Sequence, residues 1–243
     1  MKTSLSVSLP TQTMLTTKII ARMIDHSLLR PEMTEAMIIS GCELAKAYDT
    51  ASVCVRPCDV ALASRLLKGS QVLVGTVIGF PHGTHHTATK VFEAQQALDD
   101  GAAELDMVMN YSRLLSGDTA AVAADIKAVT DLAHQRQAIV KVIFENCYLS
   151  HEQIIKACEI SESAGADYVK TSTGFGTGGA KLDDIKLMRQ TCGSQVKIKA
   201  AGGIRSLDSL LAFRQAGTDR IGATATAVIL DEAKKRESEK TLL

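Results

Sequence analysis

The feature of this sequence that most constrains its fold is a regular recurrence of short apolar runs rich in β-branched residues. Eight such runs are centred near residues 24, 53, 75, 106, 141, 169, 198 and 221, with a mean separation of about 28 residues. The segments between them carry apolar residues at helical spacing, as at Val122, Ile126 and Val129. One strand and one helix per repeat, eight times over, predicts a closed parallel (β/α)₈ barrel.

The connections between these segments support the same architecture. Asp100-Gly101, Ala164-Gly165 and Ala216-Gly217 each end a helical segment, and an apolar run begins within three residues of each. A glycine in this position suits the left-handed residue that ends many helices. Short, repeated helix-to-strand connections are what a parallel barrel requires. An open doubly wound sheet is the alternative, but it would be favoured by a glycine-rich fingerprint after the first run, and none is present there.

Length and composition fit one domain of this kind. The chain has 243 residues, close to the ~250 typical of a (β/α)₈ barrel. An apolar fraction of 46% and a charged fraction of 22% are those of an ordinary globular protein. We predict a single barrel domain over residues 19–232, preceded by a Ser- and Thr-rich extension over residues 1–18 and followed by a charged tail over residues 233–243.

Charge and cysteine content narrow the partners and the location. The net charge is zero, so no global field favours nucleic acid, and no run reaches the ~18 apolar residues that a membrane span needs. The six cysteines form no pattern typical of a disulfide framework, which predicts a cytoplasmic location. His82, His85 and His86 share one Pro/Gly turn, where convergence on a metal ion is rare, so we predict no metal and no cofactor.

Polar side chains mark the carboxyl ends of six of the apolar runs. In a (β/α)₈ barrel, the carboxyl ends of the strands face the active site. Charged side chains in apolar strands are costly to bury unless they are paired or functional. A structural ion pair is the alternative for any one of them, but the set predicts a catalytic site at the barrel mouth. The six residues are Asp25, Cys54, Asp106, Lys141, Lys170 and Lys199.

Lys170 and Lys199 end neighbouring strands in this arrangement. Two ammonium groups ~5 Å apart at an effective dielectric of ~20 repel by about 3 kcal/mol, which would lower one lysine pKa from ~10.4 toward ~8. The resulting free amine can attack a carbonyl and form a Schiff base. Asp106, on the opposite wall, could relay protons through a bound water. The alternative is a strand-end Lys170 that simply reaches solvent.

Loops rich in glycine and hydroxyl groups follow the last three strands. They are Thr171–Gly174, Ala201–Gly203 and Gly222–Ala225. Phosphate sites of barrels commonly use the loops after the seventh and eighth strands. These loops therefore predict an anion site beside the lysine pair.

Seven segments together resemble the deoxyribose-phosphate aldolase family, class I (metal-independent) aldolases with a TIM-barrel fold. The resemblance covers about Ile24 to Leu230, and its most specific parts are the Val-Lys-Thr-Ser-Thr-Gly and Lys-Ala-Ala-Gly-Gly motifs. The matching segments are Ile24–Leu29, Ser52–Pro57, Gly75–Gly83, Glu104–Val108, Lys141–Glu145, Ala164–Gly174 and Lys199–Arg205.

The resemblance implies reversible cleavage of 2-deoxy-D-ribose 5-phosphate to D-glyceraldehyde 3-phosphate and acetaldehyde, a step of deoxyribonucleotide catabolism. It makes Lys170 the Schiff-base lysine, Lys199 the neighbouring proton-transfer lysine and Asp106 the proton relay. It also makes a homodimer possible, since family members are often dimers or larger. The substrate-binding residues expected from the resemblance and from the strand ends and loops are Asp25, Cys54, Lys141, Thr171, Gly174, Gly202, Gly203 and Thr224.

The sequence departs from the family at two points near the expected phosphate. Phe175 stands where some members have a lysine, and Thr224-Ala225 stands where a pair of serines is usual. We therefore expect weakened phosphate binding. Two other functions stay open: a class I aldolase for another acceptor or a larger donor, and a non-catalytic phosphosugar-binding barrel. The intact set of Lys170, Lys199 and Asp106 argues against the non-catalytic barrel.

Overall fold

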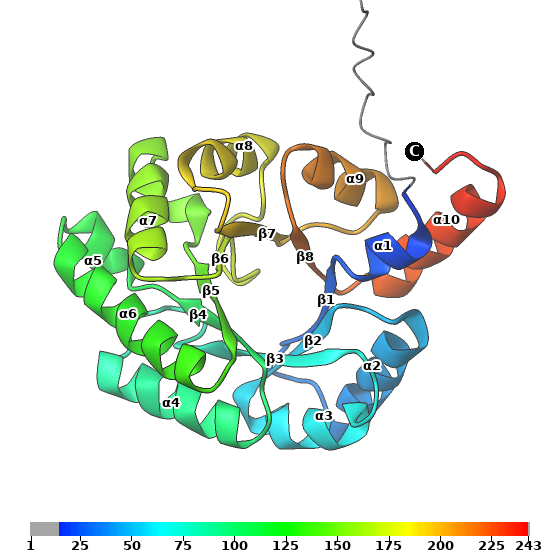
Figure 1. The fold of residues 1–243 in the computed structure, drawn as a ribbon, viewed down its shortest axis with the longest axis horizontal. Helices are drawn as coiled ribbons and strands as arrows, with labels where there is room; N and C mark the ends of the chain where they lie inside the picture. The colour runs from blue at the N-terminus through cyan, green and yellow to red at the C-terminus, as the bar shows by residue number, and fades with distance from the viewer. Residues whose placement is uncertain (1–14, 243) are drawn as a thin grey trace, which may run out of the picture.

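The computed structural model describes residues 15–242 and forms a closed barrel of eight parallel strands (Figure 1). Each strand pairs with the next along the chain, and β8 pairs with β1 to close the barrel. The predicted fold class and all eight predicted strands are confirmed. The strands are β1 (Ile24–Leu28), β2 (Ser52–Val55), β3 (Leu73–Ile78), β4 (Glu104–Val108), β5 (Ile139–Ile143), β6 (Tyr168–Lys170), β7 (Lys197–Ala201) and β8 (Arg220–Ala223).

Helices form an outer ring around the strands (Figure 1). Their apolar faces pack against the outside of the barrel in one continuous hydrophobic core. The short helix α1 precedes β1 and contacts α10. The helices are α1 (Thr17–Ala21), α2 (Glu35–Tyr48), α3 (Val60–Leu67), α4 (Thr87–Asp99), α5 (Tyr111–Leu115), α6 (Thr119–Gln135), α7 (His151–Ser163), α8 (Leu182–Thr191), α9 (Leu207–Gln215) and α10 (Thr226–Ser238), with 3₁₀ turns η1 (Pro57–Asp59) and η2 (Asn146–Tyr148).

Local sequence signals account for where several helices begin and end. Asp118 caps α6 by accepting from the N–H of Ala121, and Ser150 forms a complete capping box with Gln153 at the start of α7. Gly101 and Gly217 have φ values of 105° and 110°, a conformation that L-residues with a side chain rarely adopt. These glycines end their helices and let the next strand start at once.

The alternation of side chains along each strand separates the core from the site. In β5, Val140 and Val142 belong to the hydrophobic core beneath the helices, whereas Lys141 between them points into the barrel. In β7, Ile198 and Ala200 do the same on either side of Lys199. The strands are therefore buried on both faces, and their inward charges are enclosed.

The structure runs through both predicted boundaries of the barrel domain. Helix α1 begins at Thr17, and Leu15 before it is buried against the core. Residues 1–14 of the predicted extension lie outside the described residues. Helix α10 runs through Ser238 into the predicted tail. The boundaries after residues 18 and 232 stay predictions. Within residues 15–242, no helix has the length and hydropathy needed to cross a membrane.

Candidate active site

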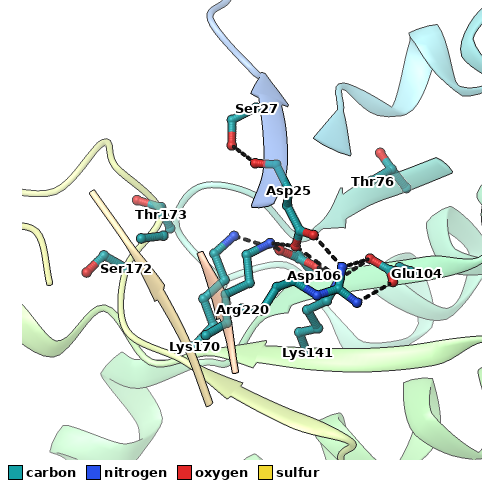
Figure 2. Close-up of polar contacts among 12 residues, drawn as sticks. Asp25, Ser27, Thr76, Glu104, Asp106, Lys141, Lys170, Ser172, Thr173 and Arg220 are labelled. Atoms are coloured by element: carbon teal, nitrogen blue, oxygen red, sulfur yellow. Dashed lines mark hydrogen bonds and ion pairs between the residues drawn. The ribbon is translucent and has the colours of Figure 1, made fainter. Parts of the chain in front are cut away.

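Asp106 is the centre of a buried cluster of charged side chains inside the barrel (Figure 2). Its Oδ2 atom accepts hydrogen bonds from Lys170 Nζ at 2.7 Å and from Lys199 Nζ at 2.6 Å. Its Oδ1 atom accepts from Lys141 Nζ at 2.9 Å. Strands β4, β5, β6 and β7 each supply one of these residues, so the predicted catalytic residues do come together.

Asp25 and Glu104 extend the cluster across the barrel. Asp25 accepts hydrogen bonds from Lys199, from Arg220 and, at 2.7 Å, from Ser52 Oγ. Glu104 accepts from Lys141 Nζ at 2.6 Å and from Arg220 Nη2 at 3.1 Å. The Arg220 guanidinium thus bridges the two carboxylates, as Figure 2 shows.

The sequence interpretation missed Glu104 and Arg220. Glu104 lies two residues before Asp106, so strand alternation places both on the inner face of β4. Arg220 is the first residue of β8, and its partner in the strand register is Lys199. The sequence therefore carried a signal for both residues, because each is a charged residue within an apolar run.

The structure corrects the predicted position of these side chains along their strands. They were expected at the carboxyl ends of the strands, yet Asp25, Asp106, Lys141 and Lys199 lie within strands that continue beyond them. Lys170 alone of the charged set ends its strand. Mutual pairing explains the difference, because opposite charges inside the barrel satisfy one another and strand pairing need not stop at them.

The balance of charge in the cluster favours one neutral lysine. The cluster holds four basic side chains (Lys141, Lys170, Lys199 and Arg220) and three carboxylates, those of Asp25, Glu104 and Asp106. Full ionisation leaves a net charge of four minus three, or +1, in a buried site. Loss of one proton leaves three of each sign, which a low-dielectric interior favours.

The surroundings of Lys170 and Lys199 shift the pKa values of the two lysines in opposite directions. Burial lowers the pKa of Lys170; Asp106 opposes this effect, and the Lys199 ammonium lowers the pKa further. For Lys199, burial is outweighed by the Asp106 and Asp25 carboxylates, so its pKa is raised. The predicted direction is thus found at Lys170. The predicted cause needs correction, since burial contributes more than repulsion by Lys199.

Asp106 and Lys141 keep their charges. For Asp106, burial raises the pKa, but Lys141, Lys170 and Lys199 together hold it well below its usual range. For Lys141, burial lowers the pKa, but the surrounding carboxylates hold it well above its usual range. The neighbouring Cys54 thiol has a pKa raised to about 11, mainly by burial, so it stays protonated.

A cavity of about 490 Å³ opens above Lys170. Within the described part of the chain, Lys170 is the member of the charged cluster that lines it; the other members lie beneath. Of the predicted substrate-binding residues, Gly174, Gly202, Gly203 and Thr224 line the cavity, whereas Asp25, Cys54, Lys141 and Thr171 do not. The further lining residues are Ser27, Leu29, Arg30, Pro31, Glu32, Thr173, Phe175, Ala201, Ile204, Arg205, Gly222 and Ala223.

The loops around this cavity are held by buried hydrogen bonds. The buried Glu145 carboxylate accepts from the Thr173 N–H at 3.2 Å and from the Thr173 hydroxyl, which in turn accepts from the Phe175 N–H at 3.0 Å. Thr171 faces away, because its hydroxyl bonds to the Ala201 backbone. The structure therefore places Thr173, rather than the predicted Thr171, on the cavity.

Two consecutive glycines after β7 line the cavity. Gly202 and Gly203 both have φ near +87°, which brings their peptide groups to the surface of the cavity without side chains. Neither N–H donates to another residue within 15–242. Successive backbone N–H groups in such a turn are suited to an anion.

The three histidines of the turn after β3 do not form a metal site in the described structure. Among residues 15–242, no group of three or more His, Cys, Asp or Glu side chains has an arrangement that could hold a metal ion.

A parallel barrel that presents a buried, weakly basic lysine to a cavity lined by glycine loops is the arrangement of a lysine-dependent aldolase. The chain belongs to the DeoC/LacD family of aldolases, whose family model matches residues 19–230. Deoxyribose-phosphate aldolase of Rhodopirellula baltica is 51% identical over 217 residues, which cover 89% of this chain and 90% of that protein. The enzyme of the same name from Clostridium perfringens is 50% identical, covering 87% and 94% of the two chains.

Solved structures agree with this assignment. The tetrameric deoxyribose phosphate aldolase of Aeropyrum pernix has a TM-score of 0.83 and 32% sequence identity to this chain, and the match covers 94% of each. The described barrel is therefore that of the family, and the predicted resemblance is confirmed.

Proposed function

We propose that this aldolase reversibly cleaves 2-deoxy-D-ribose 5-phosphate to D-glyceraldehyde 3-phosphate and acetaldehyde through a Schiff base on Lys170. The observation that carries the proposal is the pairing of a lysine of lowered pKa with the buried Asp106–Lys199 pair at the floor of an open cavity. A lysine in this state supplies the free amine that carbonyl attack requires.

The reaction begins when Lys170 Nζ attacks the aldehyde carbon C1 of the open-chain sugar. Loss of water from the adduct leaves a protonated imine. Removal of the proton from the C3 hydroxyl then breaks the C2–C3 bond, and its electron pair moves into the imine to give an enamine on C1 and C2. The fragment that contains C3, C4 and C5 leaves as glyceraldehyde 3-phosphate, with C3 as its aldehyde carbon. Protonation of the enamine at C2 and hydrolysis of the imine release acetaldehyde and the free Lys170 amine.

Asp106 and Lys199 are placed to move the protons of these steps. Asp106 accepts a hydrogen bond from the Lys170 amine through Oδ2, and Lys199 donates to the same oxygen. Both residues lie inside the barrel. Proton exchange with the substrate through a bound water is a role that such a pair can fill. Asp25 and Lys141 hold Lys199 and Asp106 by direct ion pairs, so their proposed contribution is to position the pair.

The phosphate end of the substrate fits the glycine loops. Gly202, Gly203 and Thr224 line the same cavity as Lys170, and the N–H groups of the two glycines have no acceptor within residues 15–242. A phosphate bound there would leave the sugar extending toward the lysine.

A coupled assay for glyceraldehyde 3-phosphate tests the proposal. Purified enzyme with 2-deoxyribose 5-phosphate should release it together with acetaldehyde, and a chelator should leave the rate unchanged. Turnover of another phosphosugar or a larger donor, but not of this one, would indicate an aldolase of different specificity. Tight phosphosugar binding without any turnover would indicate a non-catalytic barrel.

The assembly and the location are part of the same proposal. The resemblance makes a homodimer possible, and light scattering of the purified protein distinguishes it from a tetramer such as that of the Aeropyrum pernix enzyme. The cytoplasmic location stays a prediction.

A further inference from the structure

The rim of the cavity carries two arginines that the sequence interpretation did not include. Arg30 lies in the loop after β1, and Arg205 lies in the loop after β7. Glu32 is the carboxylate that lines the same cavity among the described residues. With Lys170 neutral, the lining therefore has two cations and one anion, a balance that favours an anionic ligand.

The wall formed by Phe175 offers no charge to such a ligand. The Phe175 ring packs edge to face against Phe80, with ring centroids 5.2 Å apart and an angle of 85° between the planes. The Phe175 N–H is already bonded to Thr173. A cation for the phosphate must therefore come from another part of the rim.

The loop that carries Arg30 is anchored. Arg56 Nη1 donates to the carbonyl oxygens of Arg30 at 3.4 Å and Pro31 at 3.0 Å. Arg56 is fixed in turn by an ion pair with Asp59 at 2.6 Å. The backbone of residue 30 is thus tied to the turn after β2, which limits the entropy lost when the Arg30 side chain orders around a ligand.

The Arg30 side chain has hydrogen-bond donors that no group within residues 15–242 uses. Its Nε pairs with Glu32 Oε1 at 2.5 Å, and the side chain is 73% exposed. Neither Nη atom donates to any group within residues 15–242. The two Nη groups can therefore form the paired hydrogen bonds with phosphate oxygens that arginine makes well.

We propose that Arg30 supplies a phosphate-binding cation for this aldolase from the loop after β1, which lines the same cavity as the apolar Phe175. This inference rests on the proposed function, in which the substrate is a phosphosugar. Arg30 binds the phosphate and does not touch the reacting carbons. Its contribution therefore falls on the discrimination between phosphorylated and unphosphorylated sugars.

The test compares kcat/KM for 2-deoxyribose 5-phosphate with kcat/KM for 2-deoxyribose in the natural chain and in Arg30→Gln. The ratio of the two should fall on the order of tenfold or more, mainly through KM of the phosphorylated sugar, as expected for the loss of charged hydrogen bonds. Inorganic phosphate should inhibit Arg30→Gln correspondingly more weakly. Arg30→Lys keeps the charge and should recover part of the ratio.

Arg113→Gln is the matched control. Arg113 is also exposed, is paired with Asp118 at 3.4 Å, and does not line the cavity, so the ratio should stay that of the natural chain. An unchanged ratio in Arg30→Gln overturns the inference while the proposed function stands. An equal loss of kcat on both sugars also overturns it, because Arg30 would then act by shaping the loop. A natural chain that cleaves neither sugar overturns the proposed function itself.

Discussion

The Nζ atom of Lys170 lies 2.7 Å from Oδ2 of Asp106, the same oxygen that Lys199 contacts from the neighbouring strand. Lys199 has a second carboxylate partner in Asp25, whereas Lys170 pairs with Asp106 alone within the described residues. The lysine with the weaker compensation for burial is the one that loses its proton more easily. This relationship supports the proposed role of Lys170 as the nucleophile, with Lys199 beside it as a cation.

Replacement of Asp106 by Asn should remove most of the activity. The substitution preserves shape but deletes the charge that three lysines share, along with the proton acceptor of the site. Loss of general acid–base catalysis lowers rates by roughly 10²–10⁴-fold. The measurement is kcat for deoxyribose 5-phosphate cleavage, with circular dichroism as the check on folding. A rate within a few fold of the natural enzyme would exclude Asp106 from proton transfer.

Lys199→Met should shift the pH dependence of the reaction as well as its rate. The Lys199 ammonium lowers the pKa of Lys170, so its removal raises that pKa. The acid limb of the kcat/KM profile of the free enzyme should therefore move to higher pH. An acid limb that stays in place while kcat falls would show that Lys199 has no electrostatic effect on Lys170.

Arg220→Met should destabilise the barrel. The substitution leaves the buried Asp25 and Glu104 carboxylates without the guanidinium that bridges them. Removal of one partner from a buried charge pair typically costs about 3–5 kcal/mol. Urea denaturation measures this loss in the free energy of unfolding. Arg136→Gln is the control, since its ion pair with Asp99 is exposed to solvent and should contribute little to stability.

His26 should make the stability of the fold depend on pH. Burial lowers the pKa of His26 to about 4, and its Nδ1 lies 2.8 Å from Thr226 Oγ1. The unfolded chain, with the ordinary pKa of about 6.5, binds the proton between pH 6.5 and 4 while the folded chain does not. The free energy of unfolding should therefore fall as the pH is lowered through this range, by about 3 kcal/mol in total. In His26→Gln, urea denaturation at pH 7 and pH 4.5 should show a smaller decrease.

The fold was predictable because each strand–helix repeat has a recognisable local sequence pattern. Each strand carries an apolar run, and glycines such as Gly101 and Gly217 mark where helices end. That Lys141, Lys170, Lys199 and Asp106 meet inside the barrel was predictable because a charge within an apolar run is conspicuous.

The depth of the site and the rest of its network were not predictable in this way. The strands pass beyond Lys141 and Lys199 because Glu104 and Arg220 complete the charge pairing, and that depends on contacts across the whole barrel. Arg30 escaped notice for a different reason. It lies in an exposed loop, where a single arginine carries no pattern, and only the folded barrel brings it to the cavity of Lys170.

The most direct test of the central claim is reductive trapping. Enzyme incubated with acetaldehyde and sodium borohydride, then digested and analysed by mass spectrometry, should carry an ethyl group on Lys170, and Lys170→Arg should carry none in this segment. The adduct should be absent from Lys141 and Lys199, which the cluster keeps protonated. A stable adduct on Lys199 in place of Lys170, or inactivation of the enzyme without any adduct on Lys170, would contradict the account.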